Sequence, residues 1–233
     1  APLPEGGSEV CGKFESGPTP SGLYEVQNNV WGSDKPQCVR IFDTGFEVLD
    51  ADHDDNGGVA AYPSIFTGCW HGTCTTNHAL PEQVADLGPL SSAWTVRIPD
   101  DQEKWNAAYD IWFSPTNDDT GTDGLELMIW IDYADVGPIG SRQDTVTIGG
   151  ITWDVYTGRA DGHGFDTISY LATDADKTRS VIDLPLNDFF DDALARDMLQ
   201  PDWWLTTIQA GFEPWSKGAG LATVDFSVTG VTT

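Results

Sequence analysis

Hydrophobic and polar residues alternate with the period of a β-strand through residues 125–131, Leu-Glu-Leu-Met-Ile-Trp-Ile. The four aliphatic side chains share one face, which predicts a core, while Glu126, Met128 and Trp130 share the other face. A carboxylate between a thioether and an indole is costly to bury as a charge. We therefore expect a concave, partly wet cleft that brings Glu126 to a ligand. The alternative is a strand covered on both faces, with Glu126 paired to an arginine.

Two further segments repeat this mixture of carboxylates, amides and indoles. In residues 24–32, the alternation places Asn29 and Trp31 on the polar face, and we assign both to the same cleft; half-buried packing is the alternative for Trp31. In residues 107–113, Asp110 points away from the core face. A hairpin loop over 114–124 would pair this strand with 125–131 and put Asp110 beside Glu126, where one carboxylate can set the pKa of the other.

Residues 203–215 form the second informative stretch. Gln209, Glu213 and Trp215 fall on one face, and Glu213 lies between Phe212 and Pro214. Desolvation by such neighbours would raise the pKa of the Glu213 carboxyl, which suits a general acid near neutral pH. The alternative is a glutamate on an edge strand in solvent.

The remaining pattern is typical of an all-β sandwich, because Gly, Pro, Asn and Asp separate short β-branched or aromatic runs. One short helix is predicted over 187–199, with Asn187 as its cap. The acidic run 50–58 predicts a hairpin turn at Asn56-Gly57. A calcium loop is the alternative, although Asp55 and Ala61 stand where such a loop needs Gly and Glu. Further strands are predicted at the following ranges: 42–49, 60–66, 94–98, 144–148, 152–156 and 165–173.

The 233 residues predict a flexible N-terminal lead over 1–10 and a single catalytic domain over 11–233. Four cysteines without zinc-site spacing predict two disulfides, Cys11–Cys38 and Cys69–Cys74, and hence secretion. The smaller loop carries Trp70 and His71, which we also place at the cleft, with a surface histidine as the alternative. No apolar run approaches the roughly 20 residues of a membrane span, so we expect no membrane partner.

The net charge and the aromatic content limit the class of molecule that the protein can bind. A formal charge of −26, from 37 acidic and 11 basic residues, excludes nucleic acid and other polyanions, which this field would repel. Ten tryptophans accompany amide side chains on several predicted faces. The charge leaves a neutral or cationic partner. Indoles stack on the C–H faces of sugars and amides bond their hydroxyls, so among such partners we expect a carbohydrate. We also expect a monomeric protein.

Five segments, in this order, resemble glycoside hydrolase family 12, the retaining β-glucanases. The combination of the third and fourth is rather specific, and the single late helix also matches. The segments are Asn-Asn-Val-Trp-Gly at 28–32, Ala-Tyr-Asp at 108–110, Glu-Leu-Met-Ile-Trp at 126–130, Gly-Pro-Ile-Gly-Ser at 137–141 and Gly-Phe-Glu-Pro at 211–214.

The resemblance implies a two-sheet β-jelly roll with a long concave cleft and no metal or cofactor. It implies Glu126 as nucleophile, Glu213 as acid/base and Asp110 as the carboxylate that assists Glu126. We add other residues of the same faces and loops to the expected sugar contacts. The complete set of expected substrate-binding residues is Asn29, Trp31, Trp70, His71, Met128, Trp130, Pro138 and Gln209.

The implied reaction is retaining hydrolysis of internal β-1,4-glucosidic bonds in cellulose-like chains, mixed-linkage β-glucan or xyloglucan. Phe212 and the pair Trp70-His71 depart from the family pattern and leave the preferred substrate open. Family 11 xylanases share the jelly roll, but their nucleophile segment is rich in tyrosine, so xylan ranks low. The main alternative function is a non-catalytic carbohydrate-binding or lectin-like sandwich. A structural sandwich whose acidic loops bind calcium ranks below it.

Overall fold

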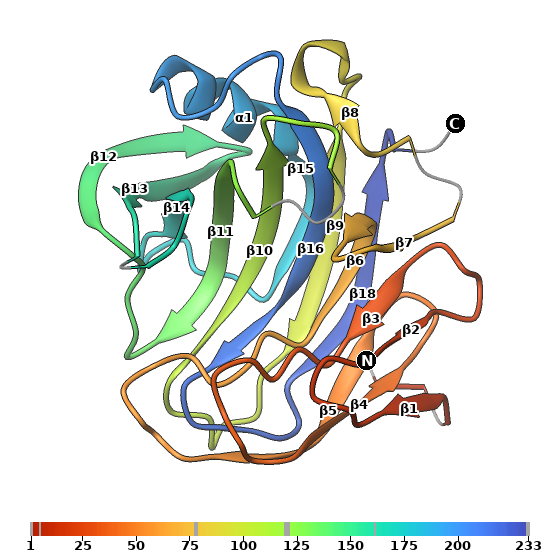
Figure 1. Cartoon of the computed structure of the whole chain (residues 1–233). Helices are drawn as coiled ribbons and strands as arrows, with labels where there is room; N and C mark the ends of the chain where they lie inside the picture. The colour runs from red at the N-terminus through yellow and green to blue at the C-terminus, as the bar shows by residue number, and fades with distance from the viewer. Residues whose placement is uncertain (1, 5, 77–78, 119–121, 161, 232–233) are drawn as a thin grey trace.

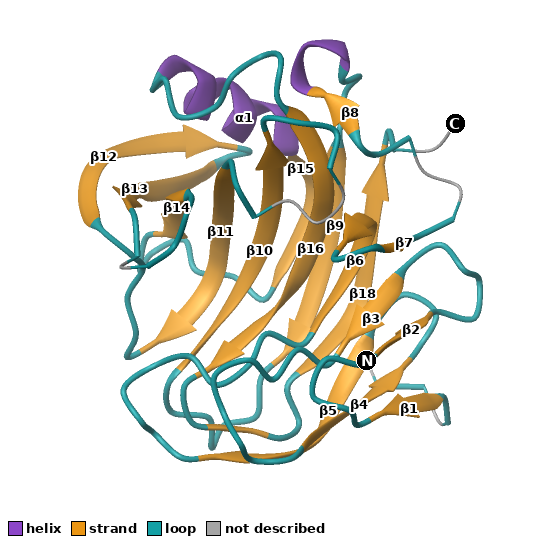
Figure 2. Ribbon diagram, viewed as in Figure 1, coloured by secondary structure: helices purple, strands orange, loops and turns teal. Residues whose placement is uncertain are grey.

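The computed structural model describes residues 2–4, 6–76, 79–118, 122–160 and 162–231. Within these ranges the chain forms two β-sheets, the α-helix α1 (Leu186–Ala195) and the 3-10 turn η1 (Val84–Asp86), as Figures 1 and 2 show. The predicted all-β sandwich with two sheets and one short helix is confirmed.

The smaller sheet has seven strands in the order β1-β4-β5-β18-β9-β15, with β17 beside β5. All of its pairs are antiparallel, so its strands run alternately up and down. Its strands are β1 (Ser8–Val10), β4 (Gln37–Ile41), β5 (Phe46–His53), β9 (Ser91–Arg97), β15 (Ser180–Pro185), β17 (Lys217–Gly218) and β18 (Ala222–Thr229).

The larger sheet has eleven strands in the order β12-β13-β14-β11-β10-β16-β6-β3-β2, with β7 beside β6 and β8 beside β16. Its pairs are antiparallel except for β11 with β14, which is parallel. The long strands β11, β10 and β16 form its centre (Figure 1). Its strands are β2 (Ser16–Pro18), β3 (Glu25–Gln27), β6 (Ser64–Trp70), β7 (Thr73–Cys74), β8 (Glu82–Gln83), β10 (Trp105–Ser114), β11 (Leu125–Ala134), β12 (Ser141–Ile148), β13 (Ile151–Gly158), β14 (Asp166–Ala172) and β16 (Trp204–Pro214).

The main core lies between the two sheets, because alternate residues of each central strand point inward. Phe212 of β16 meets the rings of Phe46 and Trp94 from the smaller sheet, at centroid distances of 5.9 Å and 6.0 Å. Tyr109 of β10 packs edge-on against Trp94 at 5.0 Å. The opposite face of the larger sheet, here called the outer face, is therefore free to carry polar side chains.

Helix α1 begins one residue before the predicted range and ends four residues earlier than expected. The predicted cap was wrong, because Pro185 precedes the helix and Asn187 lies in its first turn. The Asn187 side chain instead accepts a hydrogen bond from the Leu90 amide at 2.6 Å and donates to the Gly88 carbonyl at 3.1 Å. None of the helices in the described ranges has the length and apolar composition to cross a bilayer.

The acidic run 50–58 begins inside β5 and does not form the predicted hairpin. Strands β5 and β6 belong to different sheets, so the segment carrying Asn56-Gly57 crosses from one layer to the other. Asp54 pairs with Lys35 at 3.3 Å, and Asp55 pairs with Lys104. These acids therefore meet lysines, and no group of three or more His, Cys, Asp or Glu suited to a metal ion occurs among the described residues.

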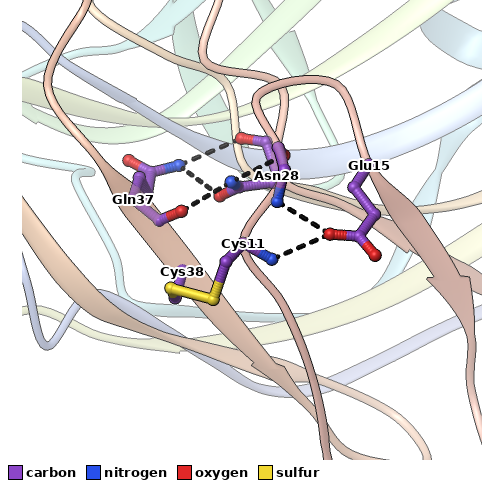
Figure 3. The surroundings of a disulfide bond; sticks show 6 residues. Cys11, Glu15, Asn28, Gln37 and Cys38 are labelled. Carbon is purple, nitrogen blue, oxygen red and sulfur yellow. Dashed lines mark hydrogen bonds between the residues drawn. A yellow bond between two sulfur atoms is a disulfide. The ribbon is translucent and has the colours of Figure 1, made fainter.

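Both predicted disulfides, Cys11–Cys38 and Cys69–Cys74, are confirmed. The first ties the segment after β1 to β4, and β1 itself pairs with β4, so residues 8–10 of the expected flexible lead belong to the sheet. Beside this disulfide, buried Asn28 donates to the Gln37 carbonyl at 2.7 Å, and the Gln37 amide donates back to Asn28 (Figure 3). This network fixes the backbone next to Asn29, where β3 has ended.

Candidate active site

Strand β10 organises the outer face. Tyr109, Ile111 and Phe113 point into the main core, as predicted, so Asp110 and Trp112 point the other way. β11 pairs with one edge of β10 and β16 with the other. Asp110 is thus placed between the strand that carries Glu126 and the strand that carries Glu213.

These three carboxyl groups lie in one cleft of about 710 Å³ on the outer face. Residues from both halves of the chain line it, including loops before β6, after β6 and before β14. The lining residues are Phe14, Ser16, Gln27, Asn29, Trp31, Tyr62, Phe66, Trp70, His71, Thr73, Asp110, Trp112, Thr122, Glu126, Gly162, His163, Gly164, Phe165 and Glu213. None of the cleft-lining residues in the described ranges is a lysine or arginine.

Glu126 is partly buried at the start of β11. Burial raises the pKa of its carboxyl from 4.5 to about 7, and a hydrogen bond from Thr167 opposes this rise. Thr167 Oγ1 donates to Glu126 Oε2 at 2.6 Å from the parallel neighbour β14, where Thr167 is the register partner of Glu126. The carboxylate is thereby oriented while its other oxygen stays available to the cleft.

Glu213 is held by Asn106, its register partner on β10. The Asn106 amide donates to Glu213 Oε2, and Asn106 Oδ1 accepts the backbone N–H of Glu213 at 3.0 Å. Burial, followed by the charge of Glu126, raises the pKa of the Glu213 carboxyl from 4.5 to about 8. The predicted rise is present, but Phe212 does not cause it, because that ring lies in the main core.

Asp110 is 7% exposed, and burial followed by the charge of Glu126 raises the pKa of its carboxyl well above 3.8. The predicted proximity of Asp110 and Glu126 follows from the register, in which Asp110 faces Met128 and Glu126 faces Trp112. Tyr62, which also lines the cleft, donates a hydrogen bond from its hydroxyl to the Ala108 carbonyl of β10 at 2.9 Å. Repulsion among the three carboxylates therefore favours retention of protons in this site.

Aromatic rings form one wall of the cleft. Trp112 lies 5.0 Å from Trp70 of β6 and 4.7 Å from Phe165 of the loop before β14, measured between ring centroids. We call Trp70, Trp112 and Phe165 the aromatic wall. The disulfide-closed turn after Trp70 carries His71, whose ring packs on Trp70 at 4.5 Å. Such a wall offers flat apolar faces beside the carboxyl groups.

The expected substrate-binding residues divide into two groups. Asn29, Trp31, Trp70 and His71 line the cleft, and Trp31 is 50% exposed. The other four do not line it: Met128 and Trp130 are buried in a second cluster on the outer face, Gln209 is fully buried, and Pro138 lies in the loop after β11.

That second cluster is buried, and its member Met128 is the register partner of Asp110. Its buried members are Ala108, Met128, Trp130 and Leu171, and Trp215 packs against them. Trp130 is only 1% exposed, with its ring 6.4 Å from that of Trp215. Trp130 thus packs against Trp215 and does not line the cleft.

Sequence reasoning missed the residues that hold the two glutamates. Asn106 lies four residues before Asp110 and therefore on the same face of β10. Extending the predicted strand by one residue at its start would have found it. Thr167 carries no comparable signal, because it reaches Glu126 through a parallel pairing between strands about forty residues apart. Tyr62, Gln27 and Phe165 also line the cleft and were not predicted.

Comparisons with known proteins agree with this geometry. Residues 22–230 match the model of glycosyl hydrolase family 12. Endoglucanase S of Pectobacterium parmentieri is 30% identical, over 82% of this chain and 75% of that protein. The xyloglucan-specific endo-beta-1,4-glucanase A of Aspergillus niger is 28% identical, over 95% of this chain and 90% of its own.

Solved structures of family 12 enzymes are also similar to this chain. Endoglucanase cel12A from Rhodothermus marinus superimposes with a TM-score of 0.89 at 42% identity, covering 95% of this chain and 98% of that one. The family 12 xyloglucanase from Bacillus licheniformis gives a TM-score of 0.85 at 26% identity, covering 95% of this chain and 99% of that one. These similarities establish the predicted jelly-roll architecture. With a family match that spans most of the chain around a cleft bearing Glu126 and Glu213, this protein belongs to glycosyl hydrolase family 12 and is a glycoside hydrolase.

Proposed function

We propose that this hydrolase is a secreted, retaining endo-β-1,4-glucanase. Its substrates are internal β-1,4-glucosidic bonds of cellulose-like chains, mixed-linkage β-glucan or xyloglucan. The observation that carries the proposal is the placement of Glu126 and Glu213 on the two strands that flank β10, both facing one cleft. Paired carboxyl groups are the chemical requirement of glycoside hydrolysis.

In this proposal the reaction is a double displacement. The Glu126 carboxylate attacks the anomeric carbon while the Glu213 carboxyl protonates the departing glycosidic oxygen. Glu213, now a base, then takes a proton from the water that hydrolyses the glycosyl-enzyme bond. Asp110 assists by its position beside Glu126.

The directions of the two pKa shifts support this assignment. Burial raises the pKa of both carboxyl groups, and the charge of Glu126 is a further cause that raises the pKa of Glu213. An ionised Glu126 therefore favours a proton on Glu213. A nucleophile must be ionised and a general acid must be protonated in the same enzyme molecule.

The aromatic residues, the relatives and the disulfides support the proposed substrates and location. The aromatic wall and the exposed ring of Trp31 suit stacking on successive sugar rings of a chain. The relatives include proteins named endoglucanase and proteins named xyloglucan-specific, so both unbranched and branched glucans are proposed. Two disulfides support secretion into an oxidising environment.

The first test is reducing-sugar release from carboxymethylcellulose, barley β-glucan and tamarind xyloglucan. We expect release by the wild type and by Glu9→Gln, which changes an exposed glutamate on β1, but none by Glu126→Gln. Proton NMR of the first product should show the β-anomer before mutarotation. An initial α-anomer would replace retention with inversion.

The same proteins decide between an enzyme and a non-catalytic sugar-binding sandwich. Calorimetry should show that Glu126→Gln still binds cello-oligosaccharides with an affinity close to that of the wild type. Binding by the wild type with no sugar release from any of the three polymers would establish the binding-module alternative instead.

A further inference from the structure

Two buried polar atoms next to the active site have complementary chemistry and no hydrogen-bond partner in the structure. One is Gln209 Nε2, an amide donor on β16, and the other is Asp110 Oδ1, a carboxyl acceptor on β10. Gln209 is 0% exposed and Asp110 is 7% exposed. Buried polar atoms are satisfied in nearly all folded proteins, so each of these atoms needs a partner.

The register of the sheet makes them direct neighbours. Asp110 and Gln209 are opposite residues of the antiparallel pair β10 and β16, so their side chains leave the sheet on the same face. Opposite residues in such a pair have Cβ atoms about 4.5 to 5.5 Å apart. A carboxyl group and a primary amide at this separation are within reach of each other.

The orientation of the Gln209 amide is set from the other side. Its Oε1 accepts a hydrogen bond from Gln27 Nε2 at 2.7 Å and another from Ser64 Oγ at 3.2 Å. Gln27 Nε2 also donates to Ser64 Oγ at 2.8 Å, which fixes the amide of Gln27. The acceptor end of Gln209 is therefore engaged by β3 and β6, and its donor end is left for β10.

We propose that Gln209 is a positioning residue, whose amide N–H is the hydrogen-bond donor for Asp110 Oδ1 and which acts through Asp110 on the protonation of Glu126. Its role for catalysis rests on the proposed function. It replaces the expectation that Gln209 binds sugar, since the side chain is fully buried and its amide oxygen is already engaged.

The consequence for titration has a definite sign. A hydrogen bond to a carboxylate favours the ionised form and lowers its pKa. The charge of Glu126 acts on Asp110 because the two carboxyl groups are neighbours, so a donor on Asp110 lowers both titration steps of the pair.

Few other groups near Asp110 can donate a hydrogen bond to its carboxylate. Glu126 of β11 and Glu213 of β16 face it with negative charge, and Tyr62 before β6 brings a phenol. The indole N–H of Trp112 on the same strand, which also has no hydrogen-bond partner in the structure, is the competing donor and lowers the pKa of Asp110. His71 and His163 lie in the same cleft. Gln209 is the donor among these that does not line the cleft, so its replacement leaves the sugar-facing surface unchanged.

The experiment compares Gln209→Met, which removes the donor, with Gln209→Glu, which places a carboxyl against Asp110. Thr207→Val is the matched control, because Thr207 is a buried polar residue of the same strand whose hydroxyl donates to the Thr67 carbonyl. Side-chain carboxyl groups of labelled protein are titrated by carbon-13 NMR, and kcat/KM is measured against pH on xyloglucan.

We expect Gln209→Met to move both titration steps of the Asp110 and Glu126 pair upward by about 0.5 to 1 pH unit, as the loss of one charge-assisted hydrogen bond requires. Gln209→Glu should move them further, because it adds a like charge. The two limbs of the kcat/KM profile should follow the same shifts, and Thr207→Val should lower the melting temperature without moving either limb.

A fall in stability or kcat with unchanged carboxyl titrations in both Gln209 variants would overturn the proposal and leave Gln209 a purely structural residue. If Gln209→Met does not fold, Gln27→Met takes its place. That variant frees the Gln209 amide to rotate and should give a smaller upward shift; unchanged titrations there also count against the proposal. The NMR titration needs no turnover, so inactivity of the wild type would refute the proposed function while the role of Gln209 is still decided.

Discussion

At the scale of single residues, the two glutamates are held by partners of different chemistry. The amide side chain of Asn106 forms hydrogen bonds with both the carboxyl group and the backbone N–H of Glu213. Glu126 accepts one hydrogen bond, from the hydroxyl of Thr167. Burial acts on both and raises their pKa values above 4.5. The active site is consequently a place where folding favours the neutral carboxyl.

This has a measurable effect on stability. Because the Glu213 pKa is about 8 when folded and near 4.5 when unfolded, the folded state binds more protons across that interval. Stability contributed by the neutral carboxyl is full below about pH 4.5 and is lost as pH rises through about 8. Glu213→Gln cannot ionise, so its melting temperature should exceed that of the wild type at pH 8 by about 2 to 4 °C, equivalent to about 1 kcal/mol.

Thermal unfolding of both proteins between about pH 5 and about pH 8 measures this, with Glu9→Gln as the exposed control. The gap between Glu213→Gln and the wild type should widen with pH. Parallel curves would show that the Glu213 carboxyl does not titrate between the folded and unfolded values proposed.

Trp70 provides a second test at the residue scale. It joins the aromatic wall through Trp112 and lines the cleft without touching the carboxyl groups through any described hydrogen bond. Trp70→Ala should raise KM for xyloglucan by roughly fivefold, the equivalent of about 1 kcal/mol of lost stacking, with a smaller change in kcat. An unchanged KM would remove Trp70 from the substrate-binding surface.

At the scale of elements, the close approach of β16 and β6 places both Gln209 and Glu213. Gly211 lies between these two residues, opposite Ser64 of β6. A methyl group added at Gly211 would meet the Pro63 carbonyl oxygen and would lie 2.7 Å from Ser64 Cβ. The strands can pack at this point because Gly211 has no side chain.

Gly211→Ala should therefore destabilise the fold by about 1 to 3 kcal/mol, because overpacking forces the strands apart. It should also lower kcat by about 10-fold to 100-fold, since a displaced β16 misplaces Glu213, the proposed general acid. Gly88→Ala is the matched control, with open space around its added methyl group. Denaturant unfolding and initial rates measure the two effects, and a fully active Gly211→Ala protein would contradict the packing argument.

At the scale of the whole molecule, the net charge of −26 surrounds a cleft that carries three carboxyl groups. Charges of one sign repel an anionic polymer and leave a neutral polymer unaffected. Carboxymethylcellulose is anionic and xyloglucan is neutral. Comparing their KM values therefore distinguishes charge repulsion from the effect of cleft shape on binding.

Raising NaCl from about 10 mM to about 150 mM shortens the screening length from roughly 30 Å to roughly 8 Å. We expect KM for carboxymethylcellulose to fall severalfold over this range, while KM for xyloglucan stays constant. Steady-state kinetics at fixed pH tests this. An equal change for both polymers would point to an effect of salt on the protein itself.

The sequence alone determined the elements with strict alternation and the chemistry they carry. Glu126 and Asp110 were assigned to the outward faces of β11 and β10 because a strand sends successive side chains to opposite sides, and one of those sides was fully apolar. The cysteine pairing and the all-β architecture also followed, from cysteine count and frequent turn residues. Each of these conclusions depends on local pattern or composition.

The tertiary structure decided what depends on pairing between distant strands. It placed β5 and β6 in different sheets, covered Trp130 with Trp215 and took Asn187 away from the helix cap. It also brought Asn106, Thr167 and Gln209 to the three carboxyl groups. Register and sheet order set these contacts, and because they join residues forty to more than a hundred positions apart, no local pattern encodes them.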